Sequence, residues 1–400
     1  MGIKGLMPFL SDSAPSCVKE TKMEAMTGRV IAIDASMCLY QFLVAVRQGA
    51  SQSNLANEAG EVTSHIQGFL SRTVRLLECG IRPVYVFDGK PPELKRETLR
   101  EREERKQEAD GELAAAMESG DADAIKKASH RTVRATPQMN ADVQELLRLL
   151  GVPVVLAPCE AEASCAALCK AGKVYATATE DMDALTFGTP KMLKNLFDTE
   201  SSRTAQKRPV FELTLSRVLE QLDVSMATFI DFCILCGCDY CGTIRGIGPA
   251  TAFKLLKLHG SLEAAVATID ANKLPPEEQW QISEARALFS SPPQVDPSQV
   301  DLKWTSPDVA GLKSFLIDRH SFNEGRVTKV VERLSACRAA GSQSRLESFF
   351  TAKAPKTLPA SEKFNPFAKR AAGSPATKRA REIGGGSNTG KAKVQRKQLS

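Results

Sequence analysis

Two short stretches decide how this chain is expected to fold: Pro158-Cys-Glu-Ala-Glu-Ala-Ser164 and Lys173-Val-Tyr-Ala-Thr-Ala-Thr-Glu-Asp-Met-Asp183. The acids of the first, Glu160 and Glu162, follow an apolar run, and those of the second, Asp181 and Asp183, follow a β-rich run. In open α/β sheets, ligands bind just beyond the carboxyl ends of parallel strands. Two acid pairs at two such ends, joined by a helix of crossover length, can therefore converge on one pocket.

Two earlier apolar runs also end in acid, at Asp34 and Asp88. Segments 36–47 and 63–78, which lie between them, carry apolar residues at helical spacing. Strand and helix thus alternate as they do around a parallel sheet, and a fifth strand is expected within 192–197. The predicted fold class is α/β, with a central, mostly parallel sheet flanked by helices.

The acids have a simpler alternative explanation. Glu160 and Glu162 can cap the helix that follows them, and so can Asp34. Asp181 and Asp183 can form a turn. Capping accounts for one or two such residues, but it gives no reason for so many in one layer.

Carboxylates gathered in one cleft without cations would repel each other, and their pKa values would rise. Hard divalent cations remove that cost. Oxygen ligands with no histidine among them suit Mg²⁺ or Mn²⁺ better than Zn²⁺. The strand-end acids therefore indicate a magnesium or manganese site.

The net charge is divided unevenly along the 400 residues. Residues 351–400 hold twelve Lys or Arg against two Glu, a net +10, so the total of +6 leaves about −4 for residues 1–350. No apolar run reaches membrane-spanning length, and the N-terminus lacks the pattern of a secretory signal. We therefore expect a soluble, intracellular protein that has no membrane partner.

Eleven cysteines without an export signal indicate reduced thiols rather than a disulfide framework. Four of them, Cys233, Cys236, Cys238 and Cys241, have the density of a zinc or iron–sulfur site. They lie in an apolar helical run that is interrupted by Gly237, so small buried core thiols are the favoured interpretation. A Cys-ligated metal is the alternative, which predicts colour or stoichiometric zinc.

Residues 91–134 differ in kind from the rest, because segment 93–108 is charged almost throughout and a second helical stretch follows at 121–134. A helix that is polar all round is solvent-bridging, held by ion pairs, or unstable. We interpret the segment as a mobile helical insertion. Its charges either form a solvated face or contact phosphate through Lys95, Arg96, Arg102, Arg131 and Arg134.

The run Ile244-Arg-Gly-Ile-Gly-Pro249 precedes an amphipathic helix. Its glycines allow a tight hairpin whose backbone can approach a phosphate or hold a monovalent cation. This pattern is typical of a helix-hairpin-helix that binds the DNA backbone. An ordinary turn between helices is the alternative.

Beyond residue 335 the composition shifts to Ser, Pro, Ala, Gly and Lys, and we expect disorder. Within this tail stands Gln343-Ser-Arg-Leu346-Glu-Ser-Phe349-Phe350, whose leucine and phenylalanines share one face of a helical turn. Such a group has no core to join, which favours a docking peptide that folds on a partner's apolar pocket. The clusters 378–381 and 391–397 can serve as nuclear import signals or as a basic arm.

Taken together, these residues resemble the eukaryotic flap endonucleases of the structure-specific 5′-nuclease superfamily, over essentially residues 1–350. The motifs that carry the resemblance are Met1-Gly-Ile-Lys-Gly-Leu, Ala32-Ile-Asp-Ala-Ser-Met, Tyr40-Gln-Phe-Leu, Pro83-Val-Tyr-Val-Phe-Asp-Gly-Lys-Pro-Pro, Glu160-Ala-Glu-Ala-Ser-Cys, Ala178-Thr-Glu-Asp-Met-Asp, Asp239-Tyr-Cys and Ile244-Arg-Gly-Ile-Gly-Pro. The chain departs from the family at Cys236-Gly-Cys238, where relatives often have Leu-Gly-Ser. A thiol beside Asp239 is expected to make activity sensitive to oxidation.

The resemblance implies a role for each matching position. Seven acids would bind two Mg²⁺ ions, for which Mn²⁺ can substitute: Asp34, Asp88, Glu160 and Glu162 around one, and Asp181, Asp183 and Asp239 around the other. Lys95 and Arg102 would be catalytic, by neutralising the scissile phosphate. The positions implied to contact DNA are Tyr40, Arg47, Arg72, Glu160, Gly237, Asp239, Gly246 and Gly248, with K⁺ held at the hairpin of the last two.

The implied activity is cleavage of branched DNA that carries a 5′ flap, with 5′–3′ exonuclease activity, in Okazaki-fragment maturation and long-patch base-excision repair. Gln343, Leu346, Phe349 and Phe350 resemble the peptide that binds the trimeric sliding clamp, proliferating cell nuclear antigen. The implied enzyme is a monomer in the nucleus, including the nucleolus, and potentially in mitochondria. The expected divisions are a nuclease region at 1–106, an arch linker at 107–123, a second nuclease region at 124–259, a helical region at 260–335 and the tail at 336–400.

A second class of function stays open at this point. A protein of the same fold that had lost its chemistry would be a DNA-binding adaptor tethered to the clamp. All seven acids are present, which favours the nuclease.

Overall fold

The structure of the protein is a computed structural model that describes residues 2–47, 63–196, 209–276 and 279–339. These residues belong to one compact unit. The predicted tail and its docking peptide at 343–350 lie outside the described residues. None of the described helices is both long enough and apolar enough to span a membrane.

A seven-stranded sheet forms the centre of the unit, in the order β1-β7-β6-β5-β2-β3-β4. The pairs formed among β6, β5, β2, β3 and β4 are parallel, whereas β7 pairs antiparallel with both β6 and β1. The strands are β1 (Val18–Thr21), β2 (Val30–Asp34), β3 (Arg82–Phe87), β4 (Val154–Leu156), β5 (Ala176–Ala178), β6 (Lys191–Lys194) and β7 (Val210–Thr214). The mostly parallel sheet is confirmed, the strand expected within 192–197 is present as β6 but begins at Lys191 and ends at Lys194, and the antiparallel strands β1 and β7 were not anticipated.

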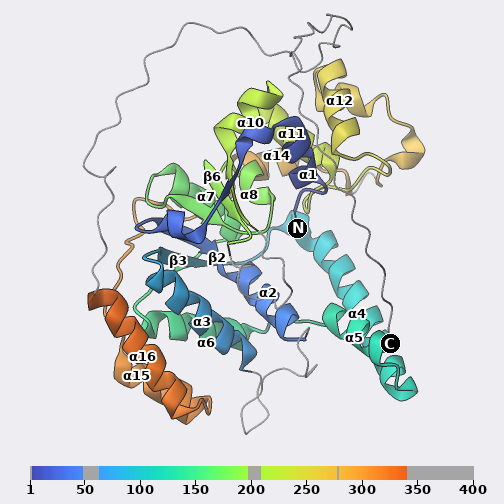
Figure 1. Ribbon diagram of the computed structural model, residues 1–400. Helices are drawn as coiled ribbons and strands as arrows, with labels where there is room; N and C mark the ends of the chain where they lie inside the picture. Colours follow the sequence, from blue (N-terminus) through green and yellow to red (C-terminus); the bar gives the residue numbers. More distant parts are fainter. Residues whose placement is uncertain (1, 48–62, 197–208, 277–278, 340–400) are drawn as a thin grey trace, which may run out of the picture. The chain divides into compact units, whose positions relative to one another are not determined.

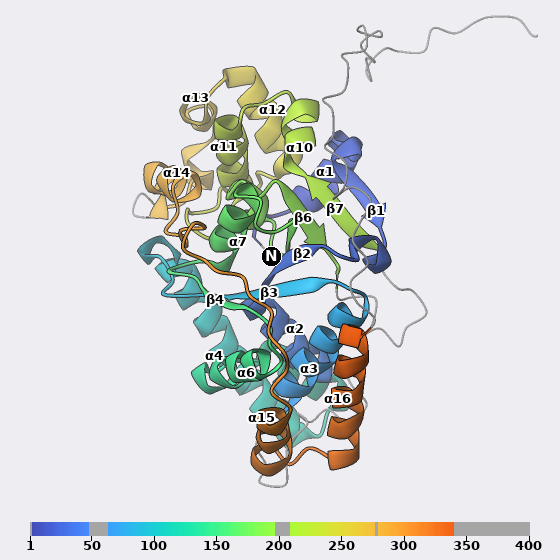
Figure 2. The same ribbon diagram turned by 90° about the vertical axis from the view of Figure 1, so that its left-hand side faces the viewer.

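Apolar side chains project from both faces of the sheet, and helices therefore pack against both faces (Figure 2). In β2, Ile31 and Ile33 join one core cluster while Ala32 joins another on the opposite face. Strands buried on both faces read as continuous apolar runs rather than as alternating ones. The helices that contribute side chains to the first cluster are α2 (Ala35–Arg47), α3 (Ser64–Glu78), α6 (Pro137–Leu149) and α16 (Glu324–Ala339). Helix α7 (Ala161–Lys170) contributes to the second.

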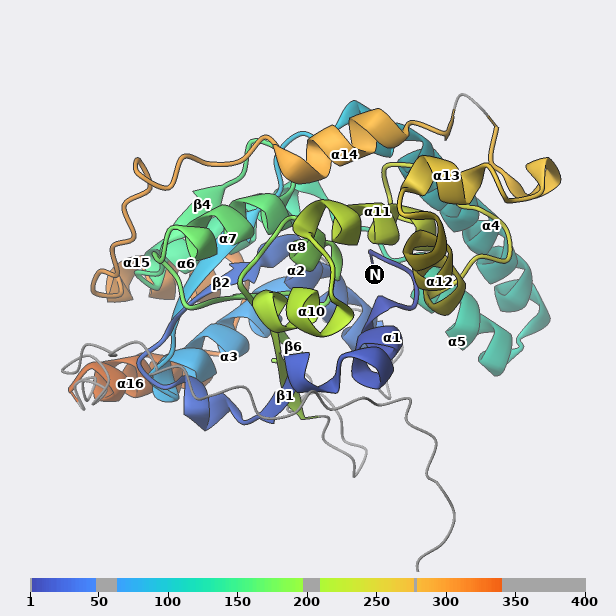
Figure 3. The same cartoon turned by 90° about the horizontal axis from the view of Figure 1, so that it is seen from above.

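A further core lies around α11, which packs against α12, α13 and α14 (Figure 3). Phe9, Phe232 and Phe253 meet there with ring centroids 5.1 to 5.5 Å apart. This core contains α1 (Leu6–Ser13), α8 (Asp183–Thr186), α10 (Leu215–Leu222), α11 (Met226–Cys236), α12 (Pro249–His259), α13 (Leu262–Val266) and α14 (Ile282–Ser290). Short helical segments complete the described chain: η1 (Pro15–Cys17), η2 (Met23–Met26), η3 (Glu93–Lys95), η4 (Ala271–Lys273), α15 (Val309–Lys313) and the π-helix η6 (Ser314–Arg319).

The charged insertion forms a helical hairpin of α4 (Arg96–Ser119) and α5 (Ala122–Arg131), which lie side by side (Figure 1). Small residues make the contact, because Ala109, Ala116 and Ala128 are its buried apolar side chains. Ion pairs join the two arms, from Arg131 to Glu112 and from Arg134 to both Glu103 and Asp110. The predicted polar helix is therefore held by an alanine seam and by ion pairs. Helix α4 runs continuously through the start of the region expected to be the arch linker.

Glycine at position 68 should be a steric requirement of the packing of α2 on α3. A Cβ atom there would lie 2.3 Å from the Phe42 ring, which is held between the Arg72 guanidinium and Phe69. We expect Gly68→Ala to destabilise the protein by about 1–3 kcal/mol in urea unfolding, despite the higher helix propensity of alanine. Gly111→Ala in α4 is the matched control, because no atom lies within 4 Å of its Cβ position, and it should stabilise by roughly 0.5–1 kcal/mol. Equal effects of the two variants would contradict this packing.

Candidate metal centre

The four neighbouring parallel strands β5, β2, β3 and β4 end at the same edge of the sheet, and each end carries acid. Asp34 is the last residue of β2, and Asp88 directly follows β3. The remaining acids of the edge follow β4 and β5: Glu160, Glu162, Asp181 and Asp183. Except for Asp88, which is exposed, all of these side chains are buried. The sheet topology thus brings the two acid pairs to the same edge, as predicted.

Asp34 both caps a helix and faces the acid cluster. Its Oδ1 accepts the backbone N–H of Met37 at 2.9 Å, and its Oδ2 accepts the Thr179 hydroxyl at 2.9 Å. The capping alternative is thus correct for Asp34. It does not argue against a metal site, because the charges of Asp88 and Asp181 also act on the same carboxyl group. Thr179, which orients Asp34 across the sheet, was not foreseen from the sequence.

Asp88, Glu160 and Glu162 form the tightest group, with one carboxylate oxygen of each within 4.8 Å of the others. Capping by Glu160 is not observed, because its side chain accepts no hydrogen bond from α7. Asp88 performs that role instead, and its Oδ1 accepts the Ala161 N–H at 2.7 Å. The start of α7 is thereby tied to the end of β3, which holds the three acids together.

Asp181 and Asp183 form the expected turn, in which Asp181 Oδ1 accepts the Asp183 N–H at 3.0 Å. Oδ1 of Asp183 is buried and has no hydrogen-bond partner within the described part of the chain. Gly2 lies against both acids, and a Cβ atom on it would come within 1.9 Å of Asp181 Oδ1 and 2.4 Å of Asp183 Oδ1. Glycine at position 2 thus leaves room beside the two carboxylates, a feature that the sequence did not reveal.

The carboxyl groups bind protons unusually tightly when no cation is present. Burial, followed by the charge of Asp88, raises the pKa of Asp34 to about 7. Burial likewise raises the pKa values of Glu162 and Asp183 well above their usual range, and neighbouring acids add to the effect. A cluster of buried oxygen donors that repel each other, one of them unpartnered, fits a hard divalent cation.

We call the helical hairpin of α4 and α5 the arch. Two basic residues at its base, Lys95 and Arg102, lie against these acids. Lys95 Nζ is 2.5 Å from Glu160 Oε2 and 3.8 Å from Asp239 Oδ2. Arg102 donates to both oxygens of Asp239, at 2.7 and 2.6 Å. Burial disfavours the Lys95 ammonium, but the carboxylates around it outweigh that effect and raise its pKa. Lys95 is therefore a cation at neutral pH.

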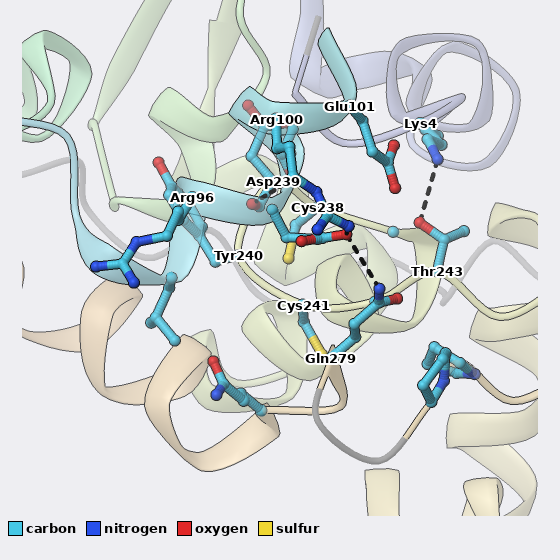
Figure 4. Close-up of a pocket in the computed structure, with 18 of the residues that line it drawn as sticks. Lys4, Arg96, Arg100, Glu101, Cys238, Asp239, Tyr240, Cys241, Thr243 and Gln279 are labelled. Atoms are coloured by element: carbon cyan, nitrogen blue, oxygen red, sulfur yellow. Dashed lines mark hydrogen bonds and ion pairs between the residues drawn. The ribbon is translucent and has the colours of Figure 1, made fainter. Parts of the chain in front are cut away.

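A cavity of about 720 Å³ opens beside Asp239, between α4 and the loop that follows α11 (Figure 4). The Thr98 hydroxyl donates to the Asp239 carbonyl at 2.9 Å, and Gln279 donates to Glu97 at 3.3 Å. The first contact joins α4 to this loop, and the second joins α4 to the segment that precedes α14. Basic side chains that line the cavity are Lys4, Arg96, Arg100, Arg102, Arg105, Arg245 and Lys273.

The residues expected to contact DNA differ in how exposed their side chains are. Tyr40 on α2 is 39% exposed, which leaves its ring accessible for stacking. Arg72 is buried, with its guanidinium 3.8 Å over the Phe42 ring and a 3.3 Å hydrogen bond to Gln41. Arg47 ends α2, and its side chain lies outside the described part. The DNA contacts of Arg47 and Arg72 stay predictions.

The glycine hairpin joins α11 to α12, as expected. Gly237 has φ +98° and its carbonyl accepts the Lys4 N–H at 3.4 Å, while Gly246 has φ +76°. Gly248 directly precedes Pro249 at the start of α12. No atom lies within 4 Å of a Cβ built on Gly246 or Gly248, so the backbone there is open to a ligand.

The cysteine cluster is a set of core thiols. Cys233 and Cys236 are almost fully buried, and Cys238 and Cys241 are each 8% exposed. Among the described residues, the group of Asp88, Glu160 and Glu162 is the one whose His, Cys, Asp or Glu ligand atoms lie close enough for a metal. The interpretation as core thiols is supported, and the Cys-ligated metal is not.

Comparison with known families agrees with this fold and site. Residues 1–109 match the XPG N-terminal domain, and residues 151–239 match the XPG I-region. Six of the seven acids lie at the sheet edge, and the seventh, Asp239, ends the second match. The fold and the acid cluster define a nuclease of the XPG class.

Sequence relatives show which kind of XPG-class nuclease this chain resembles. The chain is 52% identical to flap endonuclease 1-A of Sorghum bicolor over 363 residues, 91% of this chain and 94% of the relative. It is 52% identical to flap endonuclease 1 of Danio rerio over 351 residues, 88% of this chain and 91% of the relative. The structure of flap endonuclease-1 from Methanococcus jannaschii matches with a TM-score of 0.63 and 33% identity, covering 85% of this chain and 99% of that one. The chain belongs to the eukaryotic flap endonuclease family and is a structure-specific flap endonuclease.

Removal of Arg102 should strengthen the binding of a divalent cation, because Asp239 would lose its competing partner. The pair is partly exposed and such pairs are worth about 0.2–1 kcal/mol, so we expect roughly two- to fivefold tighter Mn²⁺ binding by Arg102→Ala in calorimetry. Arg105→Ala is the control, since Arg105 pairs with Glu101 on α4 and should leave the affinity unchanged. Weaker binding by Arg102→Ala would show that Arg102 does not compete with the cation.

Cation binding should also depend on pH. The raised pKa of Asp34 means that the metal-free folded protein holds this proton more tightly than the unfolded chain does. Its stability therefore falls as pH rises from about 4 to about 7, while a cation, which must displace the proton, binds better over the same interval. We expect Mg²⁺ to bind about tenfold more weakly at pH 6 than at pH 8. Thermal unfolding with Mg²⁺ and with EDTA measures this, and an equal Mg²⁺-dependent shift in Tm at both pH values would contradict it.

Proposed function

We propose that the acid cluster holds two divalent ions, Mg²⁺ in the cell, and that the protein hydrolyses a phosphodiester at the base of a 5′ flap. The observation that carries this is the convergence of six carboxylates at one sheet edge, faced by Asp239, Lys95 and Arg102. The predicted division is Asp34, Asp88, Glu160 and Glu162 around one ion, and Asp181, Asp183 and Asp239 around the other. Two such ions supply an activated water and charge stabilisation of the leaving oxygen.

The side chains of the arch base complete the chemistry. Lys95 and Arg102 are now neutralised by Glu160 and Asp239, the acids assigned to the cations. With those carboxylates engaged elsewhere, both basic groups can turn to the scissile phosphate and offset its growing negative charge. In our proposal, the same contacts keep the centre compact before substrate arrives and become catalytic when it is bound.

DNA would be held by its backbone and by its shape rather than by base edges. The open backbone at Gly246 and Gly248 supports a phosphate contact with K⁺ bound by the hairpin carbonyls. Exposed Tyr40 supports stacking on a base close to the cut. A related structure, the catalytic core of Rad2 in complex with a DNA substrate, matches with a TM-score of 0.62 and 27% identity, covering 81% of this chain and 98% of that one.

The cellular role that we propose is removal of 5′ flaps in the nucleus, including the nucleolus and with a potential mitochondrial pool. Cleavage would leave a nick that can be ligated during Okazaki-fragment maturation and long-patch base-excision repair. The peptide 343–350 would tether the monomeric enzyme to the trimeric sliding clamp, and the basic tail would direct nuclear import. Support for the tether comes from the sequence pattern of Gln343, Leu346, Phe349 and Phe350.

Asp183→Asn should abolish cleavage while DNA binding remains, because it removes a buried charge at the centre of the proposed cation site. On 5′-labelled double-flap DNA with Mg²⁺, the unaltered chain should give one cut near the junction, and the variant should lose at least about 10³-fold in rate. Asp12→Asn is the control, since Asp12 is an exposed residue of α1. Flap binding without cleavage by the unaltered chain would instead support the clamp-tethered adaptor.

The double variant Phe349→Ala/Phe350→Ala should lose clamp binding. Each aromatic anchor in a docking peptide contributes about 2 kcal/mol, or about 4 kcal/mol for the two, so calorimetry with the trimeric clamp should show affinity reduced about 1,000-fold. The matched control is Phe364→Ala/Phe367→Ala, which alters two phenylalanines of the same tail outside the motif. Loss of binding in the control, or its retention in the test variant, would place the docking site elsewhere.

A further inference from the structure

Cys238 and Cys241 face each other across a turn that consists of Asp239 and Tyr240. The spacing Cys-x-x-Cys is that of redox-active dithiols. The two residues form an isolated antiparallel bridge, in which Cα atoms lie about 4.5–5.5 Å apart. A disulfide requires Cα atoms about 4.4–6.8 Å apart, so the backbone is already within range of one. The described thiols are all free in this structure.

The pair can be reached from solvent. Both cysteines line the 720 Å³ cavity beside α4, and each is 8% exposed. Cys233 and Cys236, the other members of the cysteine run, are 0% and 1% exposed and do not line it. Figure 4 shows Cys238, Asp239, Tyr240 and Cys241 side by side in the wall of this cavity. Of the four cysteines in this run, Cys238 and Cys241 are therefore the two that a small oxidant in the cavity would meet first.

The turn between the cysteines is held from both sides. Both oxygens of the Asp239 carboxylate accept from one nitrogen of Arg102, and the Asp239 carbonyl accepts the Thr98 hydroxyl. The Tyr240 ring packs edge-on against Phe289 and Phe187, with centroids 5.2 and 6.2 Å away. With the tyrosine ring fixed in the core, a change in the turn has to be taken up by Asp239, the residue assigned to the metal centre.

We propose that Cys238 and Cys241 form a reversible dithiol–disulfide pair and that the oxidised form disables the metal centre by displacing Asp239. Hydrogen peroxide is the oxidant: one sulfur displaces water from it and becomes a sulfenic acid, and the second sulfur then displaces another water to form the S–S bond. Two electrons and two protons leave the thiols, and the products are one disulfide and two waters. A cellular dithiol returns two electrons and two protons to restore both thiols.

The consequence for the reaction follows from geometry and rests on the proposed role of Asp239 in cation binding. Displacement of a reacting group by about 1 Å can cost about 100-fold in rate. We expect oxidation to lower flap cleavage by about tenfold or more and to weaken Mn²⁺ binding, with both restored by dithiothreitol. Formation of the disulfide itself is measured separately, so it is tested whether or not the proposed role of Asp239 is correct.

The experiment uses the full chain with the two partly exposed thiols removed, as Cys79→Ser/Cys337→Ser, so that they do not react first. Because both thiols are largely buried, oxidation is followed over hours at pH 8 with excess peroxide. Mass spectrometry should find a loss of two hydrogens in the peptide that carries both cysteines. Cleavage and Mn²⁺ titration are then compared before and after reduction.

Cys238→Ser in the same background is the matched control. It cannot form the disulfide, and its cleavage rate should be unaffected by peroxide, whereas Cys233→Ser should remain as sensitive as the parent. Failure to detect the Cys238–Cys241 link while peroxide oxidises other thiols would overturn the proposal. So would formation of the link with no change in either cleavage or Mn²⁺ affinity.

Discussion

Electrostatic repulsion among carboxylates at one edge of the sheet is the constraint on which the rest of the structure depends. Strands β2, β3 and β4 hold their acids together because each strand has apolar side chains packed on both of its faces, while β5 packs Ala176 and Ala178 on one face and bonds the Thr177 hydroxyl to that of Thr189 on the other. The packed layers thus offset a cost that no surface cluster could sustain, since surface acids would simply move apart. Burial then raises the pKa values of Asp34, Glu162 and Asp183, which makes the cluster a strong acceptor of positive charge.

Positive charges at the base of the arch offset the repulsion among these carboxylates. Lys95 and Arg102 approach the acids from the base of α4, where Thr98 and Gln279 fix the helix to the body of the unit. The helix is therefore anchored most firmly at its first turns, next to the chemistry. Farther out, an alanine seam and an ion pair to Arg131 join it to α5, and further ion pairs join it to Arg134, just beyond α5. The same element is consequently part of the site at one end and half of a helical hairpin at the other, where α5 also contacts α2.

Much of this was predictable because the decisive signals are local in the sequence. An apolar run ending in acid is visible within a few residues, and four repetitions of it place Asp34, Asp88, Glu160 and Asp181 at one edge. Contacts between distant segments were not predictable in this way. Asp88 caps a helix that begins 73 residues later, and Thr179 orients an acid 145 residues away. Asp239 follows a helix rather than a strand, so only family resemblance identified it. The short, partly polar β1 lacks any clear strand pattern.

The pairing of β1 with β7 joins residues 18–21 to residues 210–214, near opposite ends of the sheet-forming sequence. A growing chain therefore cannot complete its sheet until more than half of the protein has been synthesised, and Asp239 arrives later still. Contacts of such long sequence separation also make folding slow and cooperative. An unfinished or truncated chain would carry several of the acids without a finished centre to hold them. Topology by itself thus delays the appearance of a DNA-cutting activity until well over half of the chain has been synthesised.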